Sequence, residues 1–202
     1  MYETVNIPRI DEIKVVNRKK ATVITKDFQP YQPDEDLVPL FVPFGSPLIT
    51  RANSSGHGID GYPCEDAENH EQLVRRLINK IDKYKEEILL FKEYYTHDAE
   101  VLIVSYGCST RPAIAAMKEA RKRGIKIGIL QLQTLWPFPE ELIESITSKV
   151  KLILVPELAL GQLKSEIIKY CHQKPVIGIN KLGGVSIQPE DILTVLFREI
   201  EK

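Results

Sequence analysis

The chain has 202 residues, enough for one ordinary domain and a substantial additional segment. Its 43% hydrophobic and 27% charged residues are typical of a soluble globular protein, and no apolar run approaches the roughly 20 residues that span a bilayer. The formal net charge of −1 provides no general field for attracting nucleic acid or an anionic membrane. We therefore expect neither nucleic acid nor a membrane among its partners.

The three cysteines, Cys64, Cys108 and Cys171, are odd in number, far apart and never arranged as CxxC. This spacing indicates no disulfide framework and no zinc or iron–sulfur site in this chain. The first ten residues include Glu3 and lack the basic and apolar regions of a signal peptide. Reduced thiols and a cytoplasmic location are the resulting expectations.

Proline is concentrated in the first third of the chain. Because proline fixes φ and removes a hydrogen-bond donor, we expect residues 1–65 to form an extended arm with short strands near 13–17 and 21–25. So long a segment without a core is expected to lie over another domain or subunit. The prolines concerned are Pro8, Pro30, Pro33, Pro39, Pro43, Pro47 and Pro63.

A helical pattern follows, with Asp66 as its N-cap, and predicts a long amphipathic helix over roughly 67–95. Its polar face includes Arg75 and Arg76, and a charged face of this kind is expected to be solvated. The second domain is therefore predicted to begin at residue 66 and to run to residue 202. The apolar face comprises Leu73, Val74, Leu77, Ile78, Ile81, Tyr84, Ile88 and Phe91.

Four short apolar segments, each followed by a helical pattern, make up the rest of the chain. Strands that are apolar on both faces and alternate with helices indicate a parallel sheet covered on both sides. The fold class is therefore predicted to be three-layer α/β/α. The strands are expected at 101–107, 125–132, 151–157 and 175–180, and the helices at 110–123, 139–148, 160–172 and 189–200.

The loops after these strands are the places where an open α/β sheet meets ligands and partners. In SYGCSTRPA (105–113), Ser109 or Thr110 can cap the next helix. Together with Arg111 and the free backbone N–H groups, they can also receive a phosphate or a carboxylate. Neither a GxxxxGK[ST] nor a GxGxxG motif is present, so the loop is not a known type of nucleotide-binding loop. The capping and the anion-binding interpretations both stay open.

Two further loops carry candidate residues. In QTLWPFPEEL (133–142), the ring of Trp136 on a proline-stiffened loop would suit an interface, or it could instead plug the edge of the sheet. In VPELALGQLKSE (155–166), Glu157 could be a general acid or base, but a structural hydrogen bond at the strand end is the favoured interpretation. Gln162 lies near the start of the following helix.

The loop SGHGIDGYPCED (55–66) precedes the long helix. Its composition, with glycine at 56, 58 and 61, predicts a flexible connector. The four histidines have no metal-ligand spacing, and no GxSxG nucleophile motif occurs. By its motifs alone, the chain looks like a supporting domain of an enzyme.

The residues resemble a known family, the alpha subunits of 2-oxoacid:ferredoxin oxidoreductases, most closely those of the 2-oxoglutarate type. The resemblance covers the carboxyl-terminal half of that subunit and nearly the whole of this chain. The segments that carry it are NIPRIDEIKVVNRKK (6–20), GHGIDGYPCED (56–66), HEQLVRRLINKI (70–81), SYGCSTRPAIAAMKEARKRGIKIGILQLQTLWPFP (105–139) and VPELALGQL (155–163).

The resemblance implies a five-stranded sheet similar to the transketolase carboxyl-terminal domain, in an enzyme that decarboxylates a 2-oxoacid on thiamine diphosphate. It also implies magnesium, an iron–sulfur cluster, ferredoxin and coenzyme A in the complete complex. The implied partners are a thiamine-binding amino-terminal alpha domain, a beta subunit and further gamma or delta subunits. This chain has no GDG motif and no cluster cysteines, so it is expected to be inactive alone and to bind no cofactor itself.

The family's segment corresponding to 55–63 is a loop near the active site that shifts during the reaction. The resemblance therefore assigns His57, Asp60 and Gly61 to the active-site region. The family usually has an acidic residue directly after the histidine, whereas Gly58 stands there in this chain. Asp60 is the candidate for the acidic position.

Two other classes of function stay open. The chain could be an oligomerisation module without a catalytic part, or a small nucleotide-binding α/β protein that uses the start of the helix at Ser109 to Arg111. Met1 resembles an internal position of the family's subunit, so we expect the sequence to be a fragment or the product of a split gene.

Overall fold

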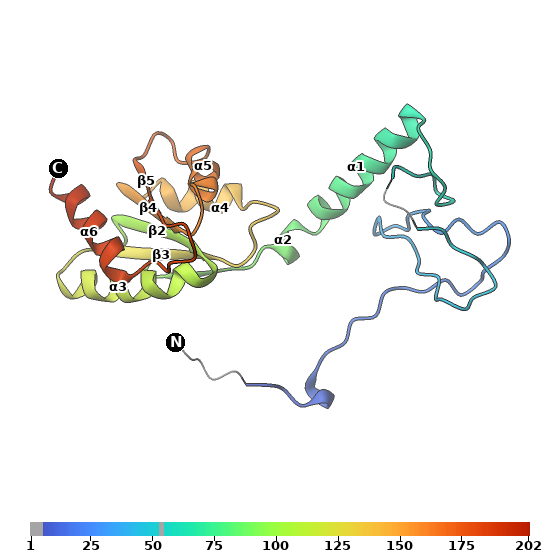
Figure 1. Cartoon of the computed structure of the whole chain (residues 1–202), viewed down its shortest axis with the longest axis horizontal. Helices are drawn as coiled ribbons and strands as arrows, with labels where there is room; N and C mark the ends of the chain where they lie inside the picture. The colour runs from blue at the N-terminus through green and yellow to red at the C-terminus, as the bar shows by residue number, and fades with distance from the viewer. Residues whose placement is uncertain (1–5, 53–54) are drawn as a thin grey trace. The chain divides into compact units, whose positions relative to one another are not determined.

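The computed structural model of the chain describes residues 6–52 and 55–202 (Figure 1). Its contacts divide the chain into two compact units, Met1–Lys83 and Tyr84–Lys202. This division places the long helix with the segment that precedes it, whereas the sequence placed it with the sheet. Two hydrogen bonds explain the difference, because Arg76 and Lys83 on the helix donate to the carbonyl oxygens of Leu37 and Glu35, at 3.2 and 2.6 Å.

The second unit contains a five-stranded sheet in the order β1-β3-β2-β4-β5. Strand β1 is antiparallel to β3, and the other three pairings are parallel. The three-layer, mostly parallel fold class is thereby confirmed. The strands are β1 Phe91–Tyr94, β2 Val101–Tyr106, β3 Ile127–Leu132, β4 Leu152–Glu157 and β5 Val176–Asn180.

Helices cover both faces of this sheet, with α3 and α6 on one side and α4 and α5 on the other (Figure 1). Their bounds agree closely with the sequence prediction, apart from α5, which ends four residues early. Each helix follows a strand, as expected for crossovers between parallel strands. The helices are α3 Thr110–Lys122, α4 Glu140–Thr147, α5 Gln162–Ile168 and α6 Pro189–Ile200, and a 3-10 turn, Gly107–Ser109, precedes α3.

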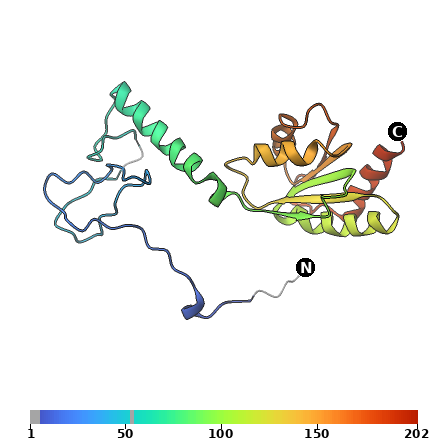
Figure 2. The same cartoon turned by 180° about the vertical axis from the view of Figure 1, so that it is seen from behind.

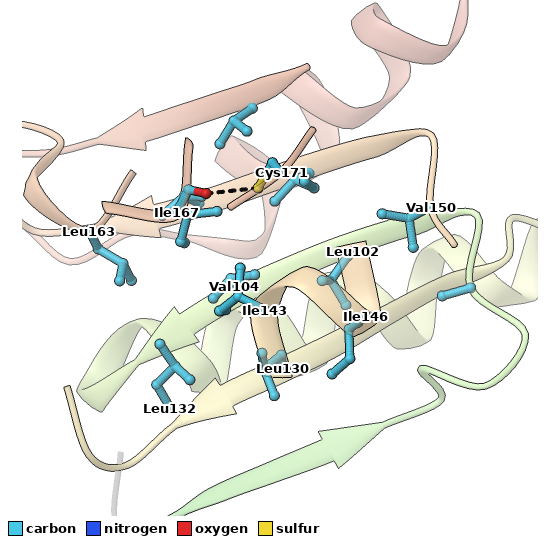
Figure 3. Packing of buried hydrophobic residues seen from close by; sticks show 14 residues of the cluster. Leu102, Val104, Leu130, Leu132, Ile143, Ile146, Val150, Leu163, Ile167 and Cys171 are labelled. Carbon is cyan, nitrogen blue, oxygen red and sulfur yellow. Dashed lines mark hydrogen bonds between the residues drawn. The ribbon is translucent and has the colours of Figure 1, made fainter. Parts of the chain in front are cut away.

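Alternate residues of the central strands belong to two separate cores. Leu102 and Val104 pack towards α4 and α5, whereas Val101 and Ile103 pack towards α3 and α6. Figure 3 shows the first of these cores, in which the thiol of Cys171 donates to the carbonyl oxygen of Ile167 at 2.9 Å. Since successive side chains of a strand point to opposite faces, strands buried on both faces produce the continuous apolar runs seen in the sequence.

The predicted helix over 67–95 is wrong in its second half. Helix α1, Ala67–Lys83, ends before Tyr84, which is not helical, and the single turn α2, Lys85–Ile88, leads into β1. Phe91 to Tyr94 pair with β3 instead, and Thr134 accepts from the N–H of Leu90 and donates to the carbonyl oxygen of Ile88. Sheet pairing thus overrides the helical spacing of Ile88 and Phe91.

The first unit consists of turns followed by α1 (Figure 2). In its described residues before α1 there is one 3-10 turn, Ile10–Glu12, and the strands expected near 13–17 and 21–25 do not form. Lys20 makes only an isolated bridge with Phe41, and the N–H of Ala21 donates to the carbonyl oxygen of Phe41 at 3.0 Å. Residues 9–29 contain no proline, but apolar side chains such as Val15, Val16 and Val23 are exposed, so no hydrophobic face stabilises a sheet there.

Helix α1 has no buried residue, and several apolar side chains of its stripe are exposed. Val74, Leu77 and Ile78 keep 45%, 42% and 47% of their surface in solvent. The unit therefore covers only part of the helix's apolar face. Exposed apolar side chains of this kind are expected where a segment packs on the surface of another protein.

Candidate functional site

The loop at 55–63 has a defined local geometry in spite of its glycines. The N–H of Gly58 donates to the carbonyl oxygen of Tyr62 at 3.0 Å, and the N–H of Cys64 donates to that of Gly56 at 3.1 Å. Gly61 has φ +86°, and a Cβ there would lie 2.7 Å from the carbonyl oxygen of Arg51. Gly61 is thus required both for its backbone conformation and for this close approach.

His57 is held on three sides. Its ring lies 4.2 Å from the ring of Tyr31, its Nδ1 lies 2.9 Å from the carbonyl oxygen of Gly58, and its own carbonyl oxygen accepts from Asn69 at 3.1 Å. Because a carbonyl oxygen can only accept, Nδ1 carries the proton and donates. In the neutral ring, Nε2 is then a hydrogen-bond acceptor.

Asp60 is exposed at the tip of the same loop. Its Oδ1 accepts from the N–H of Tyr62 at 2.9 Å, which fixes the turn. A Cβ at position 58 would lie 3.0 Å from this same oxygen. Gly58, the departure from the family's pattern, therefore leaves the carboxylate of Asp60 room that a larger residue would take.

A cavity of about 380 Å³ lies beside this loop, within residues 31–79. It lies between the turn at 31–37, the loop at 57–59 and one side of α1. None of the described residues that line it is acidic. They are Tyr31, Gln32, Pro33, Leu37, His57, Gly58, Ile59, Asn69, Gln72, Leu73, Arg75, Arg76 and Asn79.

Arg76 is the cavity residue that the sequence prediction missed. Arg75 is exposed as expected, but Arg76 is half-buried, and burial lowers the pKa of its guanidinium. The signal was its spacing, because Arg76 follows Leu73 by three residues and so borders the apolar stripe of α1. Together with His57, it makes one wall of the cavity cationic or polar.

The other candidates lie at the carboxyl ends of the central strands. At the end of β2, Ser109 and Thr110 are buried, and the hydroxyl of Thr110 lies 3.1 Å from that of Ser105. Ser109 occupies the N-cap position of α3 without a capping bond from its side chain in the described structure. Arg111, in the first turn of α3, is half-exposed.

At the end of β4, the completely buried carboxylate of Glu157 caps α5. Its two oxygens accept from the N–H groups of Leu163 at 3.1 Å and Lys164 at 3.2 Å. This is the structural role at the strand end that the sequence favoured, and it uses both oxygens. Gln162, the first residue of α5, is exposed beside it.

At the end of β3, Trp136 is 62% exposed and its neighbour Leu135 is 41% exposed. Phe138 of the same loop instead turns inward and stacks on Tyr170, with ring centroids 5.6 Å apart. The loop thus anchors itself with one aromatic ring and presents another. This exposure favours the interface interpretation of Trp136 over the plug.

Within residues 6–52 and 55–202, no three or more His, Cys, Asp and Glu side chains form a group that could hold a metal ion. In the same residues, no helix is both long and apolar enough to cross a membrane. All three cysteines are free thiols.

The part of the chain that contains the sheet matches a known protein family. The pyruvate:ferredoxin oxidoreductase core domain II matches residues 99–192, the part that spans β2 to the start of α6. Residues 99–192 are therefore similar to core domain II of that family, and they include the loops after β2, β3 and β4.

Relatives extend the likeness beyond core domain II to most of the chain. 2-Oxoglutarate synthase subunit KorA of Methanocaldococcus jannaschii is 35% identical over 90% of this chain and 49% of its own length. That of Methanothermobacter thermautotrophicus is 32% identical over 98% of this chain and 53% of its own length. The resemblance to alpha subunits of 2-oxoacid:ferredoxin oxidoreductases is confirmed, and the chain spans about half the length of these relatives.

One solved structure shares the fold over almost the entire chain. It is the 2-oxoglutarate:ferredoxin oxidoreductase of Magnetococcus marinus with 2-oxoglutarate, coenzyme A and succinyl-CoA bound. The TM-score is 0.79 at 24% identity, over 96% of this chain and 34% of that chain. At this identity the likeness concerns the fold.

Proposed function

We propose that this chain is part of the alpha subunit of a 2-oxoglutarate:ferredoxin oxidoreductase. Such an enzyme decarboxylates 2-oxoglutarate, passes electrons to ferredoxin and transfers the succinyl group to coenzyme A. The observation that carries the proposal is the 35% identity to 2-oxoglutarate synthase subunit KorA over 90% of the chain, which includes core domain II.

We propose that thiamine diphosphate, magnesium and the iron–sulfur cluster are held by other parts of the complex. The sequence supports this assignment, because it contains no GDG motif and no set of cysteines with the spacing of cluster ligands. The proposed partners are a thiamine-binding alpha domain, a beta subunit and further gamma or delta subunits.

Within that complex, the loop at 55–63 is proposed to close over the reaction. Three features support this role. His57 presents Nε2 as a proton acceptor, Asp60 is an exposed carboxylate at the tip, and Gly61 fixes the conformation of the turn. The arm, residues 1–65, is proposed to lie on a partner subunit, which agrees with exposed Ile7, Ile10 and Val16.

The proposal is tested by co-expressing the chain with a matching amino-terminal alpha domain and a beta subunit. We expect an assembled complex that reduces ferredoxin only when 2-oxoglutarate and coenzyme A are both present. Assembly without such reduction would disprove the enzymatic proposal, and absence of assembly would disprove the partnership as well.

Substitutions in the loop separate this proposal from a purely structural module. In the assembled enzyme, His57→Ala and Asp60→Ala are each expected to lower kcat by about tenfold or more, since a positioned acid or base contributes roughly 10²–10⁴-fold. Assembly should be unchanged. Wild-type turnover in both variants would favour the oligomerisation module instead.

The anion-binding interpretation of the helix start at Ser109 to Arg111 leads to a third function, a nucleotide-binding protein. Thr110 weakens it, because its hydroxyl is already paired with that of Ser105. Calorimetric titration of the chain with ATP and with coenzyme A decides the matter. We expect no saturable binding at this helix, and binding abolished by Arg111→Gln would contradict us.

A further inference from the structure

The cavity beside the 55–63 loop combines a volume suited to a small molecule with an unbalanced charge. Its volume of about 380 Å³ falls in the ~300–1,000 Å³ range of small-molecule pockets. Its lining brings together side chains from three separate stretches, of which Tyr31 and Leu37, His57, and Asn69 and Arg76 are examples. No described acidic residue lines it.

Arg76 is the centre of this imbalance. Its Nη1 donates to the carbonyl oxygen of Leu37 at 3.2 Å, and no described carboxylate lies within ion-pair distance. Burial is what lowers the pKa of its guanidinium. A half-buried cation without a counter-charge is costly, so proteins normally pair it. Most of its N–H donors are left for a ligand.

Arg75, the preceding residue of α1, provides the contrast. Its side chain is 72% exposed and pairs with Glu71 one turn earlier, with 2.7 Å between Nη2 and Oε1. Both arginines border the cavity, but only Arg76 combines partial burial with the lack of an acidic partner. The difference points to a role for Arg76 that a solvated surface arginine does not have.

Polar groups next to Arg76 complete an environment suited to an anion. The N–H of the His57 ring is already donated to the carbonyl oxygen of Gly58, so this ring adds no donor for an anion. The side-chain amide of Asn79 makes no hydrogen bond in the described structure and offers two donors. A carboxylate or a phosphate can accept from several such donors at once.

We propose that this cavity binds a small anion through a carboxylate or phosphate group, with the guanidinium of Arg76 as its principal ligand and the side-chain amide of Asn79 as a neighbouring contact. The planar fork of arginine matches either group in a bidentate manner. The proposal concerns this chain's own residues, and it holds whether or not the enzymatic proposal above is correct.

Binding can be measured on the full chain itself. The chain labelled with ¹⁵N is titrated separately with inorganic phosphate and with succinate at constant ionic strength, and the Nε–H signals of its arginines are followed by NMR. We expect a saturable shift of the Arg76 signal with at least one of the two anions. The stronger response identifies the phosphate or the carboxylate as the preferred group.

Two matched variants establish the site. Arg76→Gln is expected to weaken binding by about tenfold or more, the loss of one charge-assisted contact. Arg75→Gln should leave the affinity within about twofold. Arg76→Lys keeps the charge without the fork and should lie between them, and circular dichroism confirms that each variant is folded.

Several results would overturn the proposal. They are equal affinity in the wild type and Arg76→Gln, an equal loss in Arg75→Gln, and no saturable shift up to tens of millimolar of either anion. One combined result would point to a protein carboxylate in the cavity instead. In that case the wild type binds neither anion, and the Arg76→Gln variant fails to assemble with its partners.

Discussion

At the scale of single residues, Glu157 is a completely buried acidic side chain whose two oxygens both accept backbone hydrogen bonds. It stands at the end of β4, and Gly161, with φ 104°, turns the chain so that the first N–H groups of α5 point at its carboxylate. A carboxylate at a helix N-terminus satisfies free donors and interacts favourably with the helix dipole. Both carboxylate oxygens therefore accept hydrogen bonds from backbone N–H groups of α5.

Replacing this carboxylate should cost stability. We expect Glu157→Ala to lower the free energy of unfolding by about 2–3 kcal/mol, since two hydrogen bonds to a charged acceptor are lost. Urea denaturation followed by circular dichroism measures the change. Glu141→Ala, an exposed acidic residue in the first turn of α4, is the control and should change it by less than about 0.5 kcal/mol. An equally small effect at both positions would contradict the capping role.

A second capping carboxylate makes stability depend on pH. The ammonium group of Lys181, 2.6 Å away, and then the N–H of Gln188 lower the pKa of Asp191 from its usual value of 3.8. A lowered folded-state pKa means that the stabilisation is complete above the unfolded value and is lost as the pH falls through the folded value.

Asp191→Asn is therefore expected to reduce the free energy of unfolding at pH 7 by about 0.5–1 kcal/mol. The difference from the wild type should shrink below about pH 4, where the wild-type carboxylate also becomes protonated. Denaturation at a series of pH values measures it. Glu190→Gln, an exposed neighbour in the same turn, should show no such convergence, and a difference constant down to pH 2 would refute the linkage.

At the scale of elements, one arginine joins α3 to two other segments. Arg121 donates through Nε to the carbonyl oxygen of Ile127 at 2.7 Å and through Nη2 to that of Tyr95 at 3.2 Å. Its guanidinium also pairs with Asp98 and lies over the ring of Tyr95, 4.4 Å from the centroid. The end of α3, the start of β3 and the turn after β1 thus meet at one side chain.

Losing this junction should destabilise the sheet-containing unit. We expect Arg121→Ala to lower the free energy of unfolding by about 2 kcal/mol, through the two carbonyl bonds and the ring contact. Arg121→Lys should recover part of this, because lysine keeps the charge but not the fork. Thermal denaturation is the measurement, and Lys122→Ala, 76% exposed, is the control. Equal loss in the alanine and lysine variants would mean that the fork has no special role.

The same scale explains the error at the end of the long helix. Three- and four-residue spacing continues through Ile88 and Phe91, and a single sequence holds no sign that Phe91 faces Leu132 of a strand far along the chain. Helix α1 ends where the backbone of Tyr84 departs from helical geometry. Residues 91–94 form a strand in spite of their helical spacing, because they can pair with the edge of the sheet at β3.

At the scale of the whole molecule, three loops at the carboxyl edge of the sheet present exposed apolar side chains. They are Leu135 and Trp136 after β3, Leu158 and Leu160 after β4, and Leu182 and Val185 after β5. Neighbouring parallel strands place these loops along the same edge. Apolar side chains gathered in this way are typical of an interface.

Trp136→Ala is therefore expected to weaken assembly with the partner subunits by about tenfold or more, as for an aromatic hot spot. The stability of the chain alone should hardly change, because the side chain is 62% exposed. Sedimentation of the reconstituted complex measures the effect. Ile200→Ala, 45% exposed beside the amino ends of β2 and β4, is the matched control and should assemble normally. Equal effects of the two substitutions would argue against an interface at Trp136.

The pattern of amino acids alone was enough to predict the parallel core. Strands buried on both faces are continuous apolar runs, and the helices between them show apolar residues at three- and four-residue spacing, so these elements could be located without a structure. The structural role of Glu157 could also be anticipated, because its position after an apolar strand suggested it. The loop residues His57, Asp60 and Gly61 were assigned by resemblance to the family.

Only the tertiary structure decided which helical residues face solvent and which segments pair across the chain. Arg75 and Arg76 are neighbours of one residue type, yet the turn at Leu37 covers one and leaves the other exposed. In the same way, β1 exists because β3 offers it an edge. Burial and pairing depend on what lies opposite in space, which local periodicity does not encode.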